Sequence, residues 1–300
     1  MLNSFLQEIK RFFLKGSVVA RLIGINIAVF IIINLIGGLL YLFDSFEYYD
    51  SLANALSVPA SFDSLISKPW TIITYMFLHI NFFHILFNMI ILYVGGRMFS
   101  DFIGKDRLIG TYILGGIIGA IFYVVSFNIF PVFRETLGLS VALGASASVL
   151  AIFIAVATYM PNFKIPLILL GPVKLKYIAI VFVGIDLISI HKGNAGGHIA
   201  HLGGAIWGFL YIKFLNAGID PAKYVGNFIS GIAALFKPKP RMKVYYESKS
   251  PRPESDDDYY KRKAAEQKNL DVILDKISKH GYDSLTKQEK ELLFKFSKKQ

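Results

Sequence analysis

The feature that most constrains this chain is a series of apolar segments, each close to the length of a bilayer-spanning helix. A spanning helix needs about 20 mostly apolar residues, and six stretches of the sequence approach or reach that length. They lie near residues 22–43, 73–96, 107–127, 141–160, 174–190 and 198–216. Backbone groups in lipid must be hydrogen-bonded within the protein, which favours helices. We therefore predict an all-α membrane protein with a bundle of six transmembrane helices.

The composition agrees with a membrane protein and excludes several other classes. Hydrophobic residues make up 54% of the chain and charged residues only 18%, whereas roughly a quarter of the residues of a soluble domain are charged. The chain has no cysteine, which excludes disulfides, thiolate metal sites and cysteine nucleophiles. The formal net charge of +11 needs no nucleic-acid partner, because Lys and Arg gather on cytoplasmic loops of membrane proteins. We expect a lipid bilayer as partner and no nucleic acid.

Charge is distributed unevenly among the segments that connect these spans. Lys and Arg gather before the first span, after the second, after the fourth and after the sixth, while residues 44–70 are acidic. The positive-inside rule places the positive segments, and with them both termini, in the cytoplasm. On this topology the second, fourth and sixth spans enter the membrane from its outer face.

Four polar side chains lie inside these apolar stretches: His84 and Asn88 in the second, Ser146 in the fourth and His201 in the sixth. Polar and ionisable groups inside a membrane are costly and mark functional sites by default. All four fall early in a span that enters from the outside, so the predicted topology brings them to a similar depth. We expect them to form one site in the outer part of the membrane.

Ser146 and His201 are the candidate nucleophile and general base. A serine becomes nucleophilic when a base lies within hydrogen-bond reach, and histidine suits that role near neutral pH. Gly204 and Gly208 follow His201 at a spacing that lets a helix lie close to a partner rich in small residues. The small residues around Ser146 are the natural partner, although they could also form a packing stripe without chemistry. Ser148 is about 200° further around the same helix and should face elsewhere.

His84 and Asn88 are spaced i, i+4, so their side chains lie on one helix face. Both can donate hydrogen bonds, and two donors aimed at one point suit an oxyanion. The alternative is an interhelical hydrogen bond that only holds the bundle together. Asp186, near the outer end of the fifth span, is a candidate for a buried acid, but we expect it to reach the membrane interface, and it takes no part in the predicted mechanism.

His198 is the rival base, because it lies i−3 from His201 on one helix face. This pair could also bind a metal together with His79 and His84. No carboxylate or thiolate completes such a set, so we expect neither a metal nor a cofactor. His198 is expected at the solvated mouth of its helix, and His79 is expected to tie the first loop to the top of the second span.

These motifs resemble those of the rhomboid family of intramembrane serine proteases over roughly residues 20–215. The matching motifs are Tyr75-Met76-Phe77-Leu78-His79, His84-x-x-x-Asn88, Gly144-x-Ser146 and Ala200-His201-x-x-Gly204-x-x-x-Gly208. Only His201 has glycines three and seven residues after it, so the resemblance selects His201 over His198 as the base.

The resemblance implies a dyad of Ser146 and His201 with no acidic third member. It also implies an oxyanion site made by His84, Asn88 and the backbone N–H of Ser146. The expected activity is endopeptidase cleavage of transmembrane segments, with single-span membrane proteins as substrates. The expected location is a bacterial inner (plasma) membrane, with the active site toward the outer face.

The sequence departs from the family pattern at three positions. Thr71 follows Trp70 where the family often has arginine, Ala147 replaces the usual glycine after the serine, and Leu150 replaces a frequent tyrosine. The runner-up function is a catalytically silent rhomboid-like protein that binds or escorts membrane clients, which the retained serine and histidine disfavour. A small transporter with a histidine-lined path is a third class, disfavoured by the lack of an inverted repeat.

The C-terminal part of the chain has a different character, being rich in charge. Residues 237–240 and 250–253 contain prolines typical of an extended linker. Apolar spacing over 261–279 predicts a helix that ends near Gly281, and 284–289 contains the start signal of a last helix. The predicted domains are 1–20 (cytoplasmic N-terminal segment), 21–216 (six-helix core), 217–260 (linker) and 261–300 (small helical cytoplasmic tail).

Overall fold

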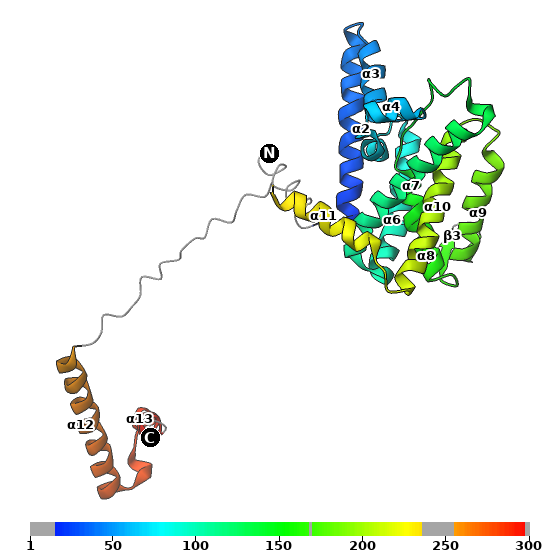
Figure 1. Cartoon of the computed structure of the whole chain (residues 1–300). Coiled ribbons are helices and arrows are strands. Elements are labelled where there is room, and N and C mark those ends of the chain that lie inside the picture. The colour runs from blue at the N-terminus through cyan, green and yellow to red at the C-terminus, as the bar shows by residue number, and fades with distance from the viewer. Residues whose placement is uncertain (1–15, 168–169, 236–254, 298–300) are drawn as a thin grey trace. The chain divides into compact units, whose positions relative to one another are not determined.

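The computed structural model describes residues 16–167, 170–235 and 255–297, and the chain divides into two units, Met1–Lys237 and Pro238–Gln300 (Figure 1). The first 15 residues of the expected N-terminal segment and the proline-containing stretches 237–240 and 250–253 lie outside the described residues. Each unit is mostly helical, as the sequence predicts.

The larger unit contains a bundle of helices and two small sheets. The α-helices among its described residues are α2 (Val18–Leu42), α3 (Glu47–Leu56), α4 (Phe62–Ser67), α5 (Thr71–Thr74), α6 (Phe82–Phe99), α7 (Leu108–Ile129), α8 (Ser146–Tyr159), α9 (Leu175–Ser189), α10 (Ala195–Asn216) and α11 (Pro221–Leu235). The strands pair antiparallel: β1 (Val58–Pro59) with β2 (Val141–Ala142), and β3 (Lys164–Leu167) with β4 (Gly171–Lys174). The two sheets are not predicted by the sequence, because their strands are too short to show an alternating pattern.

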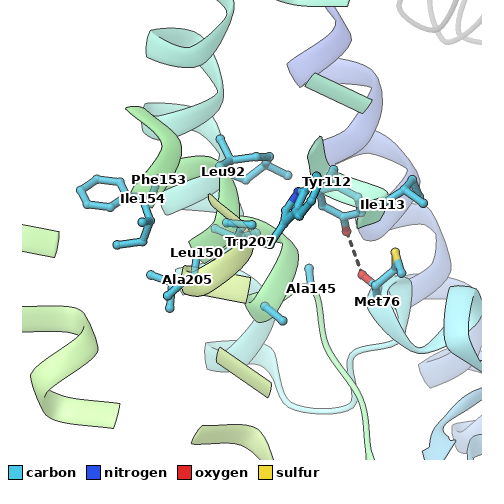
Figure 2. Close-up of a cluster of buried hydrophobic side chains, with 14 of the residues drawn as sticks. Met76, Leu92, Tyr112, Ile113, Ala145, Leu150, Phe153, Ile154, Ala205 and Trp207 are labelled. Atoms are coloured by element: carbon cyan, nitrogen blue, oxygen red, sulfur yellow. Dashed lines mark hydrogen bonds between the residues drawn. The ribbon is translucent and has the colours of Figure 1, made fainter. Parts of the chain in front are cut away.

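Helix α8 forms the centre of the bundle. All of its residues from Ala147 to Ala157 are buried, which is typical of a helix enclosed on every side. Helices α6, α7, α9 and α10 pack around it. Figure 2 shows side chains of α6, α7, α8 and α10 meeting there, including Leu92 and Trp207. The Tyr112 hydroxyl donates to the carbonyl oxygen of Met76 at 2.8 Å.

Two glycines let α10 lie directly against α8. A Cβ atom on Gly204 would overlap the carbonyl oxygen of Ala147, and one on Gly208 would overlap that of Ala151. The predicted close approach of the sixth apolar segment to the small residues of the fourth is therefore confirmed. This contact fixes the distance between the backbone that carries His201 and the backbone that carries Ser146.

Two of the predicted spans begin later than expected. Helix α6 begins at Phe82, where the side chain of Asn81 accepts the backbone N–H groups of Phe83 and His84 at 2.9 and 3.3 Å. His79 therefore precedes the helix instead of lying in it. Helix α8 begins at Ser146, and Gly144, which separates it from β2, has a φ of +120° that favours glycine.

By length and composition, two stretches of the described residues could cross a membrane, Val18–Leu42 and Phe82–Ile129. The second stretch contains both α6 and α7, and Gly104, with φ +120°, lies between them. Helix α10 and the start of α11, which meet at a bend of 104°, could together make a third span. Many large apolar side chains of α2 are exposed, such as Leu35 at 63%, which suits contact with lipid. The fold is that of a mostly helical membrane protein.

Part of the stretch expected to be linker is helical. Helix α11 packs on α7, where a Cβ atom on Gly110 would overlap the backbone of Ala222. Asp220, just before α11, accepts the Arg107 Nε–H at 2.6 Å and the Tyr211 hydroxyl at 3.2 Å. The sequence shows no clear signal for this helix beyond its apolar residues, because the ion pair joins positions far apart in the chain.

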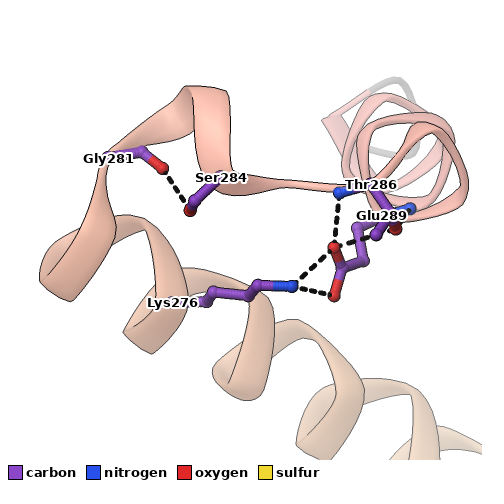
Figure 3. Close-up of polar contacts among 5 residues, drawn as sticks. All are labelled: Lys276, Gly281, Ser284, Thr286 and Glu289. Atoms are coloured by element: carbon purple, nitrogen blue, oxygen red, sulfur yellow. Dashed lines mark hydrogen bonds and ion pairs between the residues drawn. The ribbon is translucent and has the colours of Figure 1, made fainter.

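The smaller unit is a helical pair, α12 (Asp256–His280) and α13 (Lys287–Ser297). The predicted stop at Gly281 is confirmed by its φ of +75° after α12. The predicted start signal is confirmed too: Glu289 accepts the Thr286 backbone N–H at 2.7 Å, and Lys276 donates to both oxygens of Glu289 at 2.9 and 3.0 Å (Figure 3). Together with Thr286, this ammonium lowers the pKa of Glu289 to about 2.

Candidate active site

A cavity of about 310 Å³ lies between α6, α8, α9 and α10. We call it the site cavity, because it brings hydroxyl, imidazole, carboxyl and amide groups together. Its lining residues are Asn88, Ile91, Ser146, Val149, Leu150, Phe182, Ile185, Asp186, His198 and His201. Two larger hollows of about 620 and 660 Å³ flank α9, but their linings are almost entirely apolar.

Ser146 is the first residue of α8 and faces the site cavity. The N–H groups of the first helical turn have no partner within the helix, so the Ser146 N–H is free to bind an anion at this end. The imidazole of His84 lies against Gly144: a Cβ atom there would be 2.5 Å from His84 Cε1. Within the described residues, no hydrogen bond joins Ser146 to His201.

His201 is held by the carboxylate of Asp186, a residue with no part in the mechanism predicted from the sequence. Its Nδ1 lies 2.8 Å from Oδ1 of Asp186, and Nδ1 of His198 lies 2.8 Å from the same oxygen. The Asp186 residue is only 6% exposed. The prediction that Asp186 reaches the membrane interface is therefore wrong, because the carboxylate of α9 is turned toward the first turns of α10.

These contacts set the tautomer of His201. An ionised carboxylate only accepts hydrogen bonds, so Nδ1 of each histidine carries the proton that it donates to Asp186. In neutral His201 the remaining nitrogen, Nε2, then has a free lone pair and can accept a proton. Asp186 thus orients the ring and leaves a base on its other side.

His198 lies at the mouth of its helix, as predicted, but it also contacts Asp186 and so is not simply solvated. Its side chain is 21% exposed and lines the site cavity beside His201, whose side chain is 25% exposed. Asn194 begins α10 and accepts the Gly197 backbone N–H at 3.3 Å. This cap places both histidines in the first two turns of the helix.

His79, which is expected to tie the first loop to the second span, also contacts the segment before Ser146. Its Nε2 accepts the backbone N–H of Ala145 at 3.3 Å and lies 3.4 Å from Nδ2 of Asn88, while Nδ1 lies 3.4 Å from the carbonyl oxygen of Phe77. The imidazole therefore connects the residue before Ser146 to α6. Its place in the Tyr75–His79 motif is the one sequence signal for this role.

Asn88 lines the site cavity, but its amide is already engaged. Nδ2 donates to the carbonyl oxygen of His84 at 2.9 Å and faces His79 Nε2 at 3.4 Å. Since an amide has two N–H groups, neither points at the cavity. Of the predicted site residues, Ser146, His201 and Asn88 line one cavity, whereas His84 lies beside it against Gly144.

Ser148 and Leu150 are neighbours of Ser146 on α8 and lie on different sides of the helix. Ser148 faces away from the cavity, as predicted: it is fully buried, with its Oγ 3.9 Å from Sδ of Met76. Leu150 lines the cavity and supplies an aliphatic wall where the family often has a tyrosine.

Curated proteins similar to this chain are rhomboid proteins. Presenilin-associated rhomboid-like protein A, mitochondrial, of Danio rerio is 30% identical over 142 residues, which are 46% of this chain and 35% of that protein. RHOMBOID-like protein 12, mitochondrial, of Arabidopsis thaliana is 31% identical over 144 residues, 45% of this chain and 43% of that protein. Rhomboid protease GlpG of Haemophilus influenzae is 27% identical over 188 residues, 61% of this chain and 90% of that protein. The chain spans less than half the length of the two mitochondrial relatives.

Two family models match the chain. A family of unknown function, DUF6576, matches residues 254–299, which cover the helical pair α12 and α13. The Rhomboid domain model matches residues 67–217, just over half of the 300 residues, and this range contains every residue that lines the site cavity. The chain belongs to the rhomboid family.

Proposed function

We propose that the chain is an intramembrane serine endopeptidase that cleaves transmembrane segments through Ser146 and His201. The observation that carries this proposal is the site cavity: the hydroxyl at the start of α8 and an imidazole held through Nδ1 line the same space. A serine needs a base with a free lone pair, and the contact with Asp186 leaves that lone pair on Nε2.

In the proposed reaction, Ser146 Oγ attacks the scissile carbonyl carbon while His201 Nε2 takes the hydroxyl proton. The imidazolium then gives this proton to the leaving amine, and water hydrolyses the acyl-enzyme. Asp186 stabilises the imidazolium through its hydrogen bond. Catalytic hydrogen bonds are often long before substrate binds, so we assign the Ser146–His201 contact to the complex with substrate.

The oxyanion of the tetrahedral intermediate would be bound at the start of α8. The backbone N–H of Ser146 is free for it, and His84 lies against Gly144 close by. Asn88 joins them only if its amide leaves the carbonyl oxygen of His84 or the imidazole of His79. The proposal thus requires a small rearrangement of Asn88 when substrate binds.

We infer six transmembrane spans for the rhomboid core, with both termini in the cytoplasm and the site cavity toward the outer face. Support comes from the six apolar segments and the alternating loop charge. Single-span membrane proteins are the proposed substrates. A bacterial inner membrane is the proposed location; of the named relatives, two are mitochondrial and one is bacterial.

The test is cleavage of a panel of single-span reporter proteins in membranes by the wild type, Ser146→Ala and His201→Ala. We expect both substitutions to abolish cleavage, since removing a serine or histidine of such a pair costs about 10⁶-fold in kcat. If the His198→Ala protein still cleaves, His201 and not His198 is the base. Cleavage by Ser146→Ala at the wild-type rate would disprove the proposal.

A catalytically silent binder or escort of membrane clients is the second candidate. It is favoured by the missing Ser146–His201 hydrogen bond within the described residues and by the engaged amide of Asn88. This function predicts that the reporters co-purify with the wild type and with Ser146→Ala equally, without cleavage by either.

A further inference from the structure

Asp186, His198 and His201 bring three metal-ligating groups to one point. One ligand atom from each lies within 4.8 Å of the other two. The two histidines are spaced i, i+3, which places them on the same face of α10, and the carboxylate comes from α9. The sequence alone predicts this histidine pair without a carboxylate; the packing of α9 against α10 places the carboxylate of Asp186 beside the pair.

The charge of this cluster is not balanced by a permanent cation. Within the described residues, the ion-pair partners of Asp186 are His198 and His201, and no Lys or Arg contacts it. Buried charges are normally paired or bound to a metal. A bound cation would therefore suit this buried carboxylate.

We propose that these three side chains bind Zn²⁺ and that zinc switches the enzyme off. Two imidazoles and one carboxylate, with a fourth position open to the site cavity, form a ligand set typical of zinc sites. The cavity of about 310 Å³ beside the cluster can hold the water that fills this position. Zinc here acts as an inhibitor, and the inhibitory part of the inference rests on the proposed function.

The inhibition follows from the tautomer of His201. When Nδ1 donates to Asp186, Nε2 has the lone pair that takes the proton of Ser146. When Nδ1 binds zinc, the neutral ring carries its proton on Nε2 instead. Nε2 is then a donor and cannot act as the base. The metal thus blocks the reaction without touching Ser146.

Binding is tested directly on the full chain with Ser146→Ala, using Co²⁺ as a spectroscopic substitute for zinc. We expect one Co²⁺ per chain, with the visible absorption of a four-coordinate site, and its displacement by Zn²⁺. Adding Asp186→Asn or His198→Ala should weaken binding by more than tenfold, because even outer-shell changes cost roughly 10–100-fold in metal affinity. His198→Gln is a second variant in case His198→Ala does not fold.

His191→Ala is the matched control. His191 is an exposed histidine in the turn after α9, outside the cluster. This substitution removes one histidine without removing a ligand, so its Co²⁺ spectrum and affinity should equal those of the Ser146→Ala parent. An equal loss of binding in His191→Ala and His198→Ala would overturn the assignment.

Inhibition is tested on proteins with Ser146 intact, each compared with its own zinc-free rate. We expect the zinc concentration for half inhibition to rise more than tenfold in His198→Ala and to stay unchanged in His191→Ala. Equal zinc sensitivity in both would overturn the inhibitory mechanism.

The two proposals fail in different ways. Specific Co²⁺ binding by a chain that cleaves no reporter would keep the metal site and refute the protease. Cleavage without specific Co²⁺ binding would refute the metal site and keep the protease.

Discussion

The two sides of the site cavity satisfy their polar groups in different ways. On the α9–α10 side, one carboxylate oxygen accepts a hydrogen bond from each of two histidines at 2.8 Å, and Nε2 of His201 stays available as a base. On the α6 side, the amide of Asn88 is bound to the carbonyl oxygen of its own helix and faces His79. The base is thus preorganised, whereas the amide must move before it can bind an oxyanion. Preorganised groups contribute to catalysis without a cost of rearrangement.

Of the substitutions that distinguish the two sides, Asp186→Asn on the α9–α10 side is expected to lower kcat the most. An amide at this position can present a donor to Nδ1 and favour the wrong tautomer of His201. Replacing the buried aspartate of a serine protease triad in this way lowers kcat by about 10⁴-fold, and we expect a loss of up to that size here. The measurement is kcat and KM for one reporter in detergent.

Asp186→Glu is the conservative control, because it keeps a carboxylate and should recover part of the rate. A purely structural role would lower protein yield and leave kcat of the folded fraction unchanged. A kcat equal to that of the wild type in Asp186→Asn would remove the carboxylate from the mechanism.

The next largest effect is expected from Asn88→Ala. Losing one oxyanion donor costs about 10²–10³-fold in kcat, with little change in KM. The result is compared with His84→Ala, because the His84 imidazole lies against Gly144 and its ring nitrogens make no hydrogen bond within the described residues. If both variants keep the wild-type kcat, the α6 side has only a structural role and the backbone N–H of Ser146 acts alone.

A smaller effect, on stability, is expected from His79→Ala. The substitution leaves the backbone N–H of Ala145 without its partner at 3.3 Å. A buried donor without a partner costs about 1–3 kcal/mol, so the midpoint of thermal unfolding in detergent should fall. His79→Gln offers an acceptor again and should recover part of the loss. An unchanged midpoint in His79→Ala would show that this contact contributes nothing to the position of α8.

The difference between the two sides also explains what the sequence could predict. The sequence predicts Ser146, His201 and the glycines between α10 and α8, because they belong to short motifs. The spacing within these motifs indicates which side chains share a helix face. The contact between Asp186 and His201 depends on the turn between α9 and α10. The apolar periodicity of the sequence predicts the two helices, but it does not predict how this turn orients their side chains. The apolar residues around His79 predict a helix at this position. The helix cap at Asn81 shows instead that His79 lies in a loop. Helix α11 is not predicted by the sequence for a similar reason, since its packing on α7 joins segments that are distant in the chain.

The smallest effect is expected from Ser148→Ala, which tests whether the cavity defines the site. Ser148 shares the small-residue motif of Ser146, but it is fully buried on the far face of α8, with Met76 Sδ 3.9 Å from its hydroxyl. A bond to sulfur this long is weak, and removing one hydroxyl from such a place leaves the backbone of α8 unchanged. We therefore expect kcat within a few-fold of the wild type, measured beside Ser146→Ala on the same reporter. A loss as deep as that of Ser146→Ala would mean that both sides of α8 contribute to catalysis, and the comparison between the α9–α10 side and the α6 side would no longer describe the site.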